Sequence, residues 1–95
     1  NASNSMYKYA VAYKTYKKTK NKYAKEFLID EQKHVAKAII REMEEKDFAD
    51  FVKLDFINLK YDADIVKCLE EQNWNVALAY MLEEGKNSSN DAFVI

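Results

Sequence analysis

With 95 residues, of which 48% are hydrophobic and 33% charged, the chain has the balance typical of a small globular protein. This balance excludes a disordered tail, and no apolar run approaches the roughly 20 residues that would cross a bilayer. Proline is absent and there is a single glycine, which disfavours an all-β sandwich or barrel because tight turns depend on both residues.

Cysteine usage and the first residues bear on compartment and domain organisation. The single cysteine, Cys68, cannot form an internal disulfide, and residues 7–16 contain too much lysine for a signal peptide. Both features predict a cytoplasmic protein. Residues 1–5, which precede a methionine, are expected to be an expression-tag remnant, residues 6–84 a single small domain, and residues 85–95 a polar connector with an apolar C-terminal tip.

An alternating pattern begins the chain. Within residues 7–16, aromatic and apolar side chains at 7, 9, 11 and 13 alternate with lysine and alanine, which predicts a strand with one buried face. Polar residues 17–21 follow, and Tyr23, Phe27 and Ile29 then share one parity. We therefore predict an N-terminal β-hairpin with a lysine-rich loop. The side chains assigned to the buried face of its first strand are Tyr7, Tyr9, Val11 and Tyr13.

A helical period follows the predicted hairpin. Asp30 is a suitable N-cap, and Val35 and Ile39 lead an apolar series at the spacing of one helical face. This predicts a helix over residues 31–45. A competing interpretation is one long helix over about residues 20–46, because the aromatic side chains before Asp30 also tolerate that period.

The second half of the chain predicts mixed elements. Residues 48–60 alternate and are rich in aromatic and β-branched side chains, which favours a strand. Asp62 or Asp64 then caps a short helix that ends at Gln72, whereas residues 76–82 fit a strand and a helix equally well. The predicted fold class is therefore α+β, with helices on one face of a small sheet. Its expected core contains Tyr9, Val11, Phe27, Val35, Ile39, Leu54, Phe56, Ile65, Leu69 and Leu78.

Charge is segregated along the chain. Residues 7–26 contain seven lysines and one acidic residue, a net charge of +6, whereas the remainder has a net charge of −7. Lysines interleaved with tyrosines are typical of a surface that binds single-stranded nucleic acid, and Tyr16 is the ring expected to be free to stack on a base. A solvated loop that keeps the hairpin edge from pairing explains the same lysines. The candidate nucleic-acid-binding residues are Lys14, Tyr16, Lys17, Lys18, Lys20 and Lys22.

Signals for a reactive centre are weak. His34 and Cys68 are each the sole residue of their type, too few for a zinc site, and the acidic residues at 42, 44 and 45 are expected on the solvated face of a helix. No glycine-rich loop is present to hold a phosphate group. We therefore expect no catalytic residue, no metal, no cofactor and no small-molecule substrate.

Two apolar features are candidates for contact with another protein. Trp74 lies between two asparagines, and the C-terminal tip consists of Phe93, Val94 and Ile95. A tryptophan buried in its own domain and a tail packed on that domain explain them equally well. The opposite charges of the two parts of the chain also favour a homodimer.

Residues 65–82 resemble the second and third helices of ubiquitin-associated domains, in which a short helix, an asparagine-containing turn and a Val-x-x-Ala helix follow one another. The positions that match are Leu69, Asn73, Asn75, Val76 and Ala79. Lys60 and Tyr61 stand where that family has a glycine-aromatic loop that helps to bind ubiquitin. The resemblance implies a ubiquitin-binding helical module in residues 47–84.

The function predicted from these observations is that of a non-enzymatic protein-binding or regulatory module, of the kind found as short bacterial or phage proteins. Binding of single-stranded nucleic acid through the basic N-terminal hairpin is the first alternative. The module related to ubiquitin-associated domains is the second.

Overall fold

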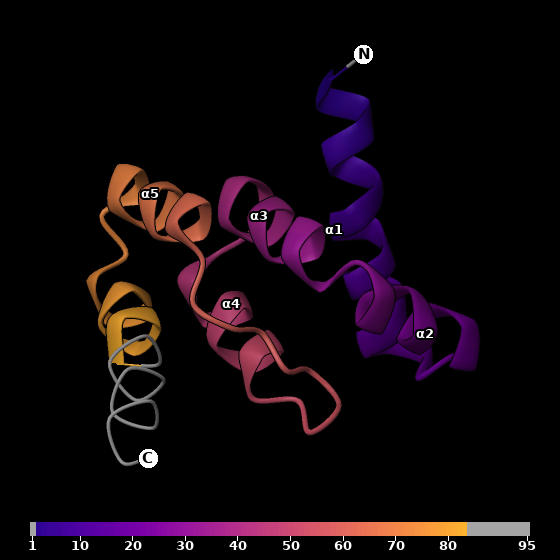
Figure 1. Ribbon diagram of the computed structural model, residues 1–95. Helices are drawn as coiled ribbons and strands as arrows, with labels where there is room; N and C mark the ends of the chain where they lie inside the picture. Colours follow the sequence, from indigo (N-terminus) through magenta and orange to yellow (C-terminus); the bar gives the residue numbers. More distant parts are fainter. Residues whose placement is uncertain (1, 84–95) are drawn as a thin grey trace. The chain divides into compact units, whose positions relative to one another are not determined.

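The computed structural model describes the backbone of residues 2–83 and the side chains of residues 6–83, and all regular secondary structure in this part is helical (Figure 1). The predicted α+β fold is therefore wrong. The chain divides into two compact units, Asn1–Leu59 and Lys60–Ile95, which we call unit 1 and unit 2. The helices are α1 (Ala2–Thr19), α2 (Lys22–Asp30), α3 (Gln32–Glu42), α4 (Glu45–Val52), α5 (Ala63–Gln72) and a last helix over residues 75–83.

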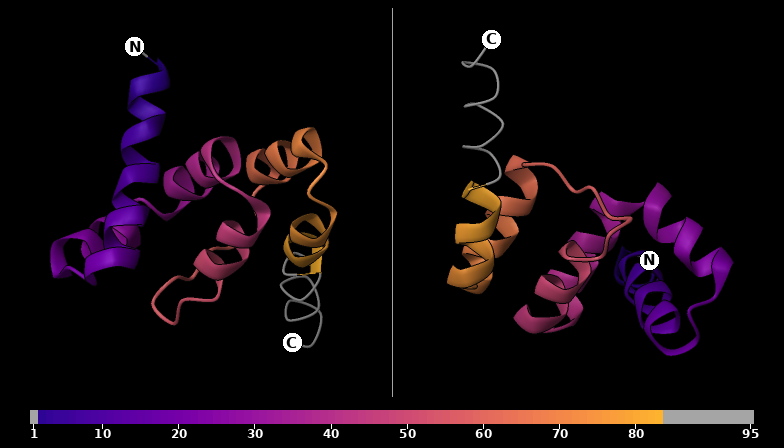
Figure 2. Two further views of the ribbon diagram at one scale, coloured as in Figure 1. Left: turned by 180° about the vertical axis from the view of Figure 1, so that it is seen from behind. Right: turned by 90° about the horizontal axis from the view of Figure 1, so that it is seen from below.

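Helix α1 stands where the first strand of the hairpin was predicted. Tyr9, Tyr13 and Tyr16 recur at spacings of four and three residues and form its inner face, with Tyr13 buried and the other two half-buried. Tyr7 and Val11, which the alternating pattern placed on the buried side, are exposed. The helical period prevails because α1 packs across α3, a contact that alternation along the sequence does not reveal (Figure 2).

The lysine-rich segment after α1 joins two helices and does not form a hairpin loop. Lys20 has a φ of 56°, which turns the chain sharply. The Asn21 side chain then caps α2, because its Oδ1 atom accepts hydrogen bonds from the backbone N–H groups of Tyr23 (2.8 Å) and Ala24 (3.2 Å). The pattern assigned to a second strand therefore belongs to α2.

The predicted helix over residues 31–45 is confirmed in its main part by α3. Its predicted cap is wrong, because Asp30 is the last residue of α2 and Glu31 is the residue between the two helices. Glu31 donates its N–H to the Phe27 carbonyl at 2.9 Å, and its own carbonyl accepts from Val35 N at 2.8 Å. The alternative of one long helix is interrupted at this position.

The strand predicted over residues 48–60 is replaced by α4 and an irregular segment. A reciprocal capping box between Glu44 and Asp47 starts α4, and Phe48, Phe51 and Val52 are buried at helical spacing. The chain then turns, and Asn58 N donates to Gln32 Oε1 on α3 at 2.9 Å. Local capping and the burial of one helical face outweigh the β-branched composition here.

The core of unit 1 lies where α1, α3 and α4 meet. The Tyr13 ring contacts Phe51 edge-on at 5.3 Å, and its hydroxyl donates to the Asp47 carbonyl at 3.3 Å. Val35 and Ile39 are fully buried, as predicted. Among the other predicted core residues of unit 1, Val11 is exposed and the half-buried ones are Tyr9, Phe27, Leu54 and Phe56.

Unit 2 follows its sequence signals more closely. Of the two predicted caps, Asp62 is the one that caps α5, with Oδ1 accepting from Asp64 N at 2.9 Å and from Ile65 N at 3.1 Å. Asn73 adopts the left-handed conformation with φ of 60°, and Trp74 N donates to the Leu69 carbonyl, which is the hydrogen-bond pattern of a Schellman turn. Residues 75–83 are helical, which decides between the two alternatives that the sequence left open for residues 76–82. The predicted core residues Ile65 and Leu69 are buried, and Leu78 is half-buried.

Candidate functional site

The candidate nucleic-acid residues lie on α1, in the joint that follows it and at the start of α2. Lys17 is already engaged, because its Nζ atom lies 3.2 Å from Asp47 Oδ1 and 5.3 Å from the centre of the Tyr13 ring. A carboxylate and a ring thus compensate this ammonium group within unit 1. Lys17 is therefore a structural residue that joins α1 to α4.

Tyr16 is not the free ring that the sequence pattern predicted. Its side chain is half-buried and contacts Phe56 edge-on at 5.4 Å. Lys20 Nζ lies 4.9 Å from the centre of the Tyr16 ring. A base stacking on Tyr16 would displace these contacts, so the structure does not favour the predicted stacking role.

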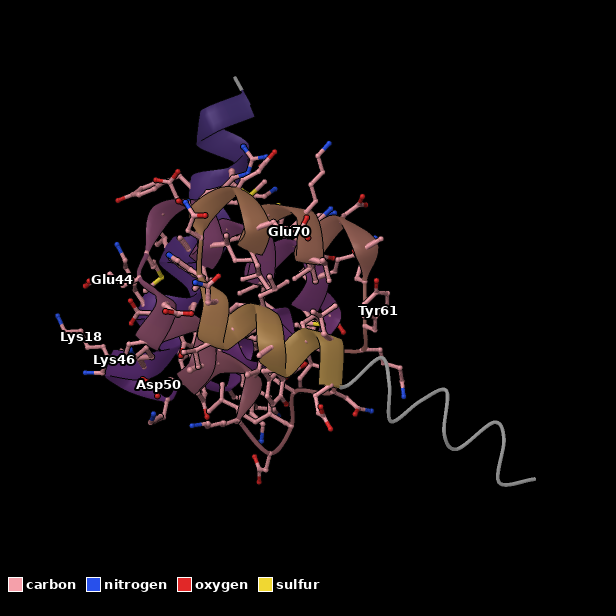
Figure 3. All side chains as sticks on the ribbon, turned by 90° about the vertical axis from the view of Figure 1, so that its left-hand side faces the viewer. Lys18, Glu44, Lys46, Asp50, Tyr61 and Glu70 are labelled. Carbon is pink, nitrogen blue, oxygen red and sulfur yellow. The ribbon has the colours of Figure 1, made fainter. Side chains whose placement is uncertain are left out.

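The other candidate lysines, Lys14, Lys18 and Lys22, are exposed, and Lys18 projects outward from unit 1 in Figure 3. Lys14 and Lys18 follow Tyr7 and Val11 on the outer side of α1, at spacings of four, three and four residues. Lys14 Nζ lies 6.0 Å from the centre of the Tyr7 ring. We call Tyr7, Val11, Lys14 and Lys18 the outer row of α1.

His34 belongs to an aromatic stack. Tyr9 lies between two rings, with centroid distances of 5.7 Å to Phe27 and 5.3 Å to His34 and an interplanar angle of 17° in both pairs. His34 Nδ1 also lies 3.0 Å from Glu31 Oε1. These contacts tie the start of α3 to α1 and α2, which gives the histidine a structural role.

Two groups of unit 1 have perturbed pKa values, and both serve packing. Burial raises the pKa of Tyr13 far above its usual value, and the nearby carboxylates of Asp50 and Asp47 raise it further. For Asp47, burial acts to raise the pKa, but the hydrogen bond from Glu44 N and the Lys17 ammonium outweigh it, so that the pKa lies below its usual value. Tyr13 therefore stays neutral and Asp47 stays charged near neutral pH.

Unit 2 presents an exposed apolar surface on its last helix. Ala77 and Met81 are buried, whereas Val76 is 75% exposed and Tyr80 is 39% exposed on another side of the helix. These exposed side chains recur one turn apart, so they lie along one helical face. We call Val76, Ala79, Tyr80 and Glu83 the Val76 face.

The predicted protein contacts have different outcomes. Trp74 is half-buried at the turn between α5 and the last helix. Tyr61, at the loop singled out by the family resemblance, is 46% exposed and is labelled in Figure 3. The apolar tip formed by Phe93, Val94 and Ile95 lies outside the described residues, as does the connector that precedes it.

Sequence reasoning missed the Val76 face because it left residues 76–82 open between a strand and a helix. The signal was present in Asn73, since a residue that tolerates the left-handed conformation ends one helix and allows another to begin. With a helix from residue 75, Ala77 and Met81 fall on one side and Val76 and Tyr80 on another. Of the residues that carry the resemblance to ubiquitin-associated domains, Val76 and Ala79 are exposed, and the module expected over residues 47–84 is divided between unit 1 and unit 2.

Comparison of the chain with family models, with curated proteins and with solved structures gives no match. Among the described residues, no group of three histidine, cysteine or acidic side chains is placed to hold a metal ion. None of the described helices combines the length and apolar character needed to cross a membrane.

Proposed function

We propose that the chain is a non-enzymatic protein-binding module and that its partner binds on the Val76 face. The observation that carries this proposal is the 75% exposure of Val76, with Tyr80 exposed one turn further along the same helix. An aliphatic and an aromatic side chain side by side on a helix gain free energy when a partner removes them from water. Adjacent apolar side chains of this kind are a common feature of protein interfaces.

The charge of unit 2 defines the chemistry of the partner. Residues 60–83 contain five acidic residues and two lysines, and Glu83 lies on the Val76 face itself. A partner with an apolar patch surrounded by basic side chains would match this surface. Ubiquitin is the partner implied by the resemblance, and the helix, left-handed asparagine turn and second helix of unit 2 support its use as the first test.

Titration of the ¹⁵N-labelled chain with ubiquitin tests the proposal. Trp74 is the only tryptophan and lies two residues before Val76, so its single indole signal reports on this region. We expect shifts in this indole signal, in Tyr61 and along residues 75–83. A Val76→Asp substitution should weaken binding at least about tenfold, because it places a charge where the partner buries an apolar side chain.

The matched control is Val11→Asp, which makes the same change at an exposed helical position in unit 1. It should leave binding unchanged in dilute solution. Shifts confined to α1, or a V76D chain that binds like the wild type, would contradict the proposed face. A titration without any shift would exclude ubiquitin as the partner.

A further inference from the structure

Two exposed rows of the molecule have the same spacing and opposite charge. On α1, Tyr7 and Val11 are followed by Lys14 at positions i, i+4 and i+7. On the last helix, Val76, Tyr80 and Glu83 occupy positions i, i+4 and i+7. The first two residues of each row are exposed apolar side chains, with Tyr7 52% and Val11 38% exposed, and the third is an exposed charged residue. Residues at this spacing lie along one side of a helix.

We propose that these rows bind each other between two copies of the chain, so that α1 of each copy packs on the last helix of the other. With the two helices side by side and parallel, apolar side chains meet apolar side chains. Lys14 of one copy then faces Glu83 of the second copy. A dimer with two such contacts, one in each direction, uses both rows of both copies.

The charge of the two units supports this occupant. Residues 1–59 contain twelve basic and nine acidic residues, whereas residues 60–95 contain three basic and seven acidic residues. Contact between unit 1 of one copy and unit 2 of another brings net positive and net negative surfaces together. Contact between two copies of the same unit would bring surfaces of the same sign together. Lys14 is exposed, and its Nζ atom lies 6.0 Å from the centre of the Tyr7 ring on the same row.

The dimer would cover the Val76 face, so it goes beyond the proposed function and competes with it. At high chain concentration the second copy occupies the face that a partner would bind. At low concentration the face is open. A weak dimer is expected, since each contact involves only a few exposed side chains.

Sedimentation equilibrium over a range of chain concentrations at low salt tests this inference. We expect the wild type to dimerise, and K14E or E83K alone to raise the dissociation constant about tenfold or more, because each homodimer then has two like-charge contacts. An equimolar mixture of the K14E and E83K chains should regain wild-type affinity. In the mixed dimer one contact is native and the other has its charges exchanged.

Lys67→Glu is the matched control, since it makes the same charge reversal at an exposed position of α5 outside both rows. It should dimerise like the wild type. A wild type that stays monomeric, single variants that match the control, or a mixture no tighter than its components would overturn the inference. The proposed function is tested separately, because K14E leaves the Val76 face intact and should still bind ubiquitin.

Discussion

The hydrogen bonds within unit 1 and those within unit 2 differ in the sequence separation that they span. In unit 1, Tyr13 and Lys17 on α1 reach Asp47 on α4, over sequence separations of 34 and 30 residues. In unit 2, local hydrogen bonds define the ends of α5: Asp62 caps its start, and the turn of Asn73 and Trp74 ends it. Long-range side-chain contacts thus accompany the buried core of unit 1, whereas in unit 2 local caps and turns accompany buried side chains such as Ile65, Leu69 and Met81.

The two units also differ in how they use their surfaces. In unit 1 several lysines have partners within the unit: Lys17 forms an ion pair with Asp47, and Lys25 Nζ lies 5.0 Å from the centre of the Phe56 ring. In unit 2, Val76 and Tyr80 remain exposed on the last helix. Composition alone made the basic segment look like the binding surface, but the structure assigns much of its charge to packing. Exposed apolar side chains occur in both units, with Tyr7 and Tyr23 in unit 1 and Val76 and Tyr80 in unit 2, so the two surfaces differ mainly in their charge.

The largest expected effect comes from the core of unit 1. Phe51→Ala should lower the free energy of unfolding of unit 1 by about 3–5 kcal/mol, since it removes a fully buried ring that contacts Tyr13. Urea unfolding followed by circular dichroism measures this loss. Trp74 fluorescence reports on unit 2 alone, so its transition should change less than the helical signal does.

Phe56→Ala is the control for this prediction, because Phe56 is half-buried and a smaller loss is expected. If F51A shifts the Trp74 transition as much as the helical one, the two units unfold together. The comparison between a packed unit and a locally stabilised unit would then fail.

A smaller effect is expected at the turn of unit 2. Asn73→Ala should cost about 1–2 kcal/mol, because a side chain with a Cβ atom and no local hydrogen bond is disfavoured at φ of 60°. Asn73→Gly should be neutral or slightly stabilising, since glycine adopts this conformation freely. The midpoint of the Trp74 fluorescence transition in urea measures both changes. Equal loss in N73A and N73G would show that the side chain matters and the backbone conformation does not.

Local signals in the sequence predicted the parts of the fold that depend on them. The Asp62 cap and the apolar period that begins at Val35 each gave a helix that the structure confirms. The start of α4 was missed, because the structure begins it with a capping box of Glu44 and Asp47, whereas the alternation of Val52, Leu54 and Phe56 predicted a strand.

The rest of the fold depends on contacts that a single sequence does not show. The first segment fits a helix if the inner face is Tyr9, Tyr13 and Tyr16, and it fits a strand if that face is Tyr9, Val11 and Tyr13. The packing of α1 on α3 decides in favour of the helix. The candidate site shares this limit. Tyr16 contacts Phe56, which lies 40 residues further along the chain. Lys17 donates a hydrogen bond to Asp47, which lies 30 residues further along.

The smallest expected effect concerns the ion pair that joins α1 to α4. The pKa of Asp47 is lowered in the folded chain, despite partial burial, by the Glu44 N–H and the Lys17 ammonium. The ionised form therefore binds best to the folded state, and its contribution is complete above the unfolded pKa of about 3.9 and is lost as pH falls through the lower folded value. Asp47→Asn should remove this contribution of up to about 1 kcal/mol to the free energy of unfolding at neutral pH. The free energy of unfolding of the variant should then fall less than that of the wild type on acidification. Urea midpoints at pH 7 and pH 3 measure the difference, with Asp55→Asn, an exposed carboxylate of the segment after α4, as the control. If D47N loses as much stability on acidification as the wild type, the pair does not join the two helices energetically, and packing around Tyr13 alone holds α1 against α4.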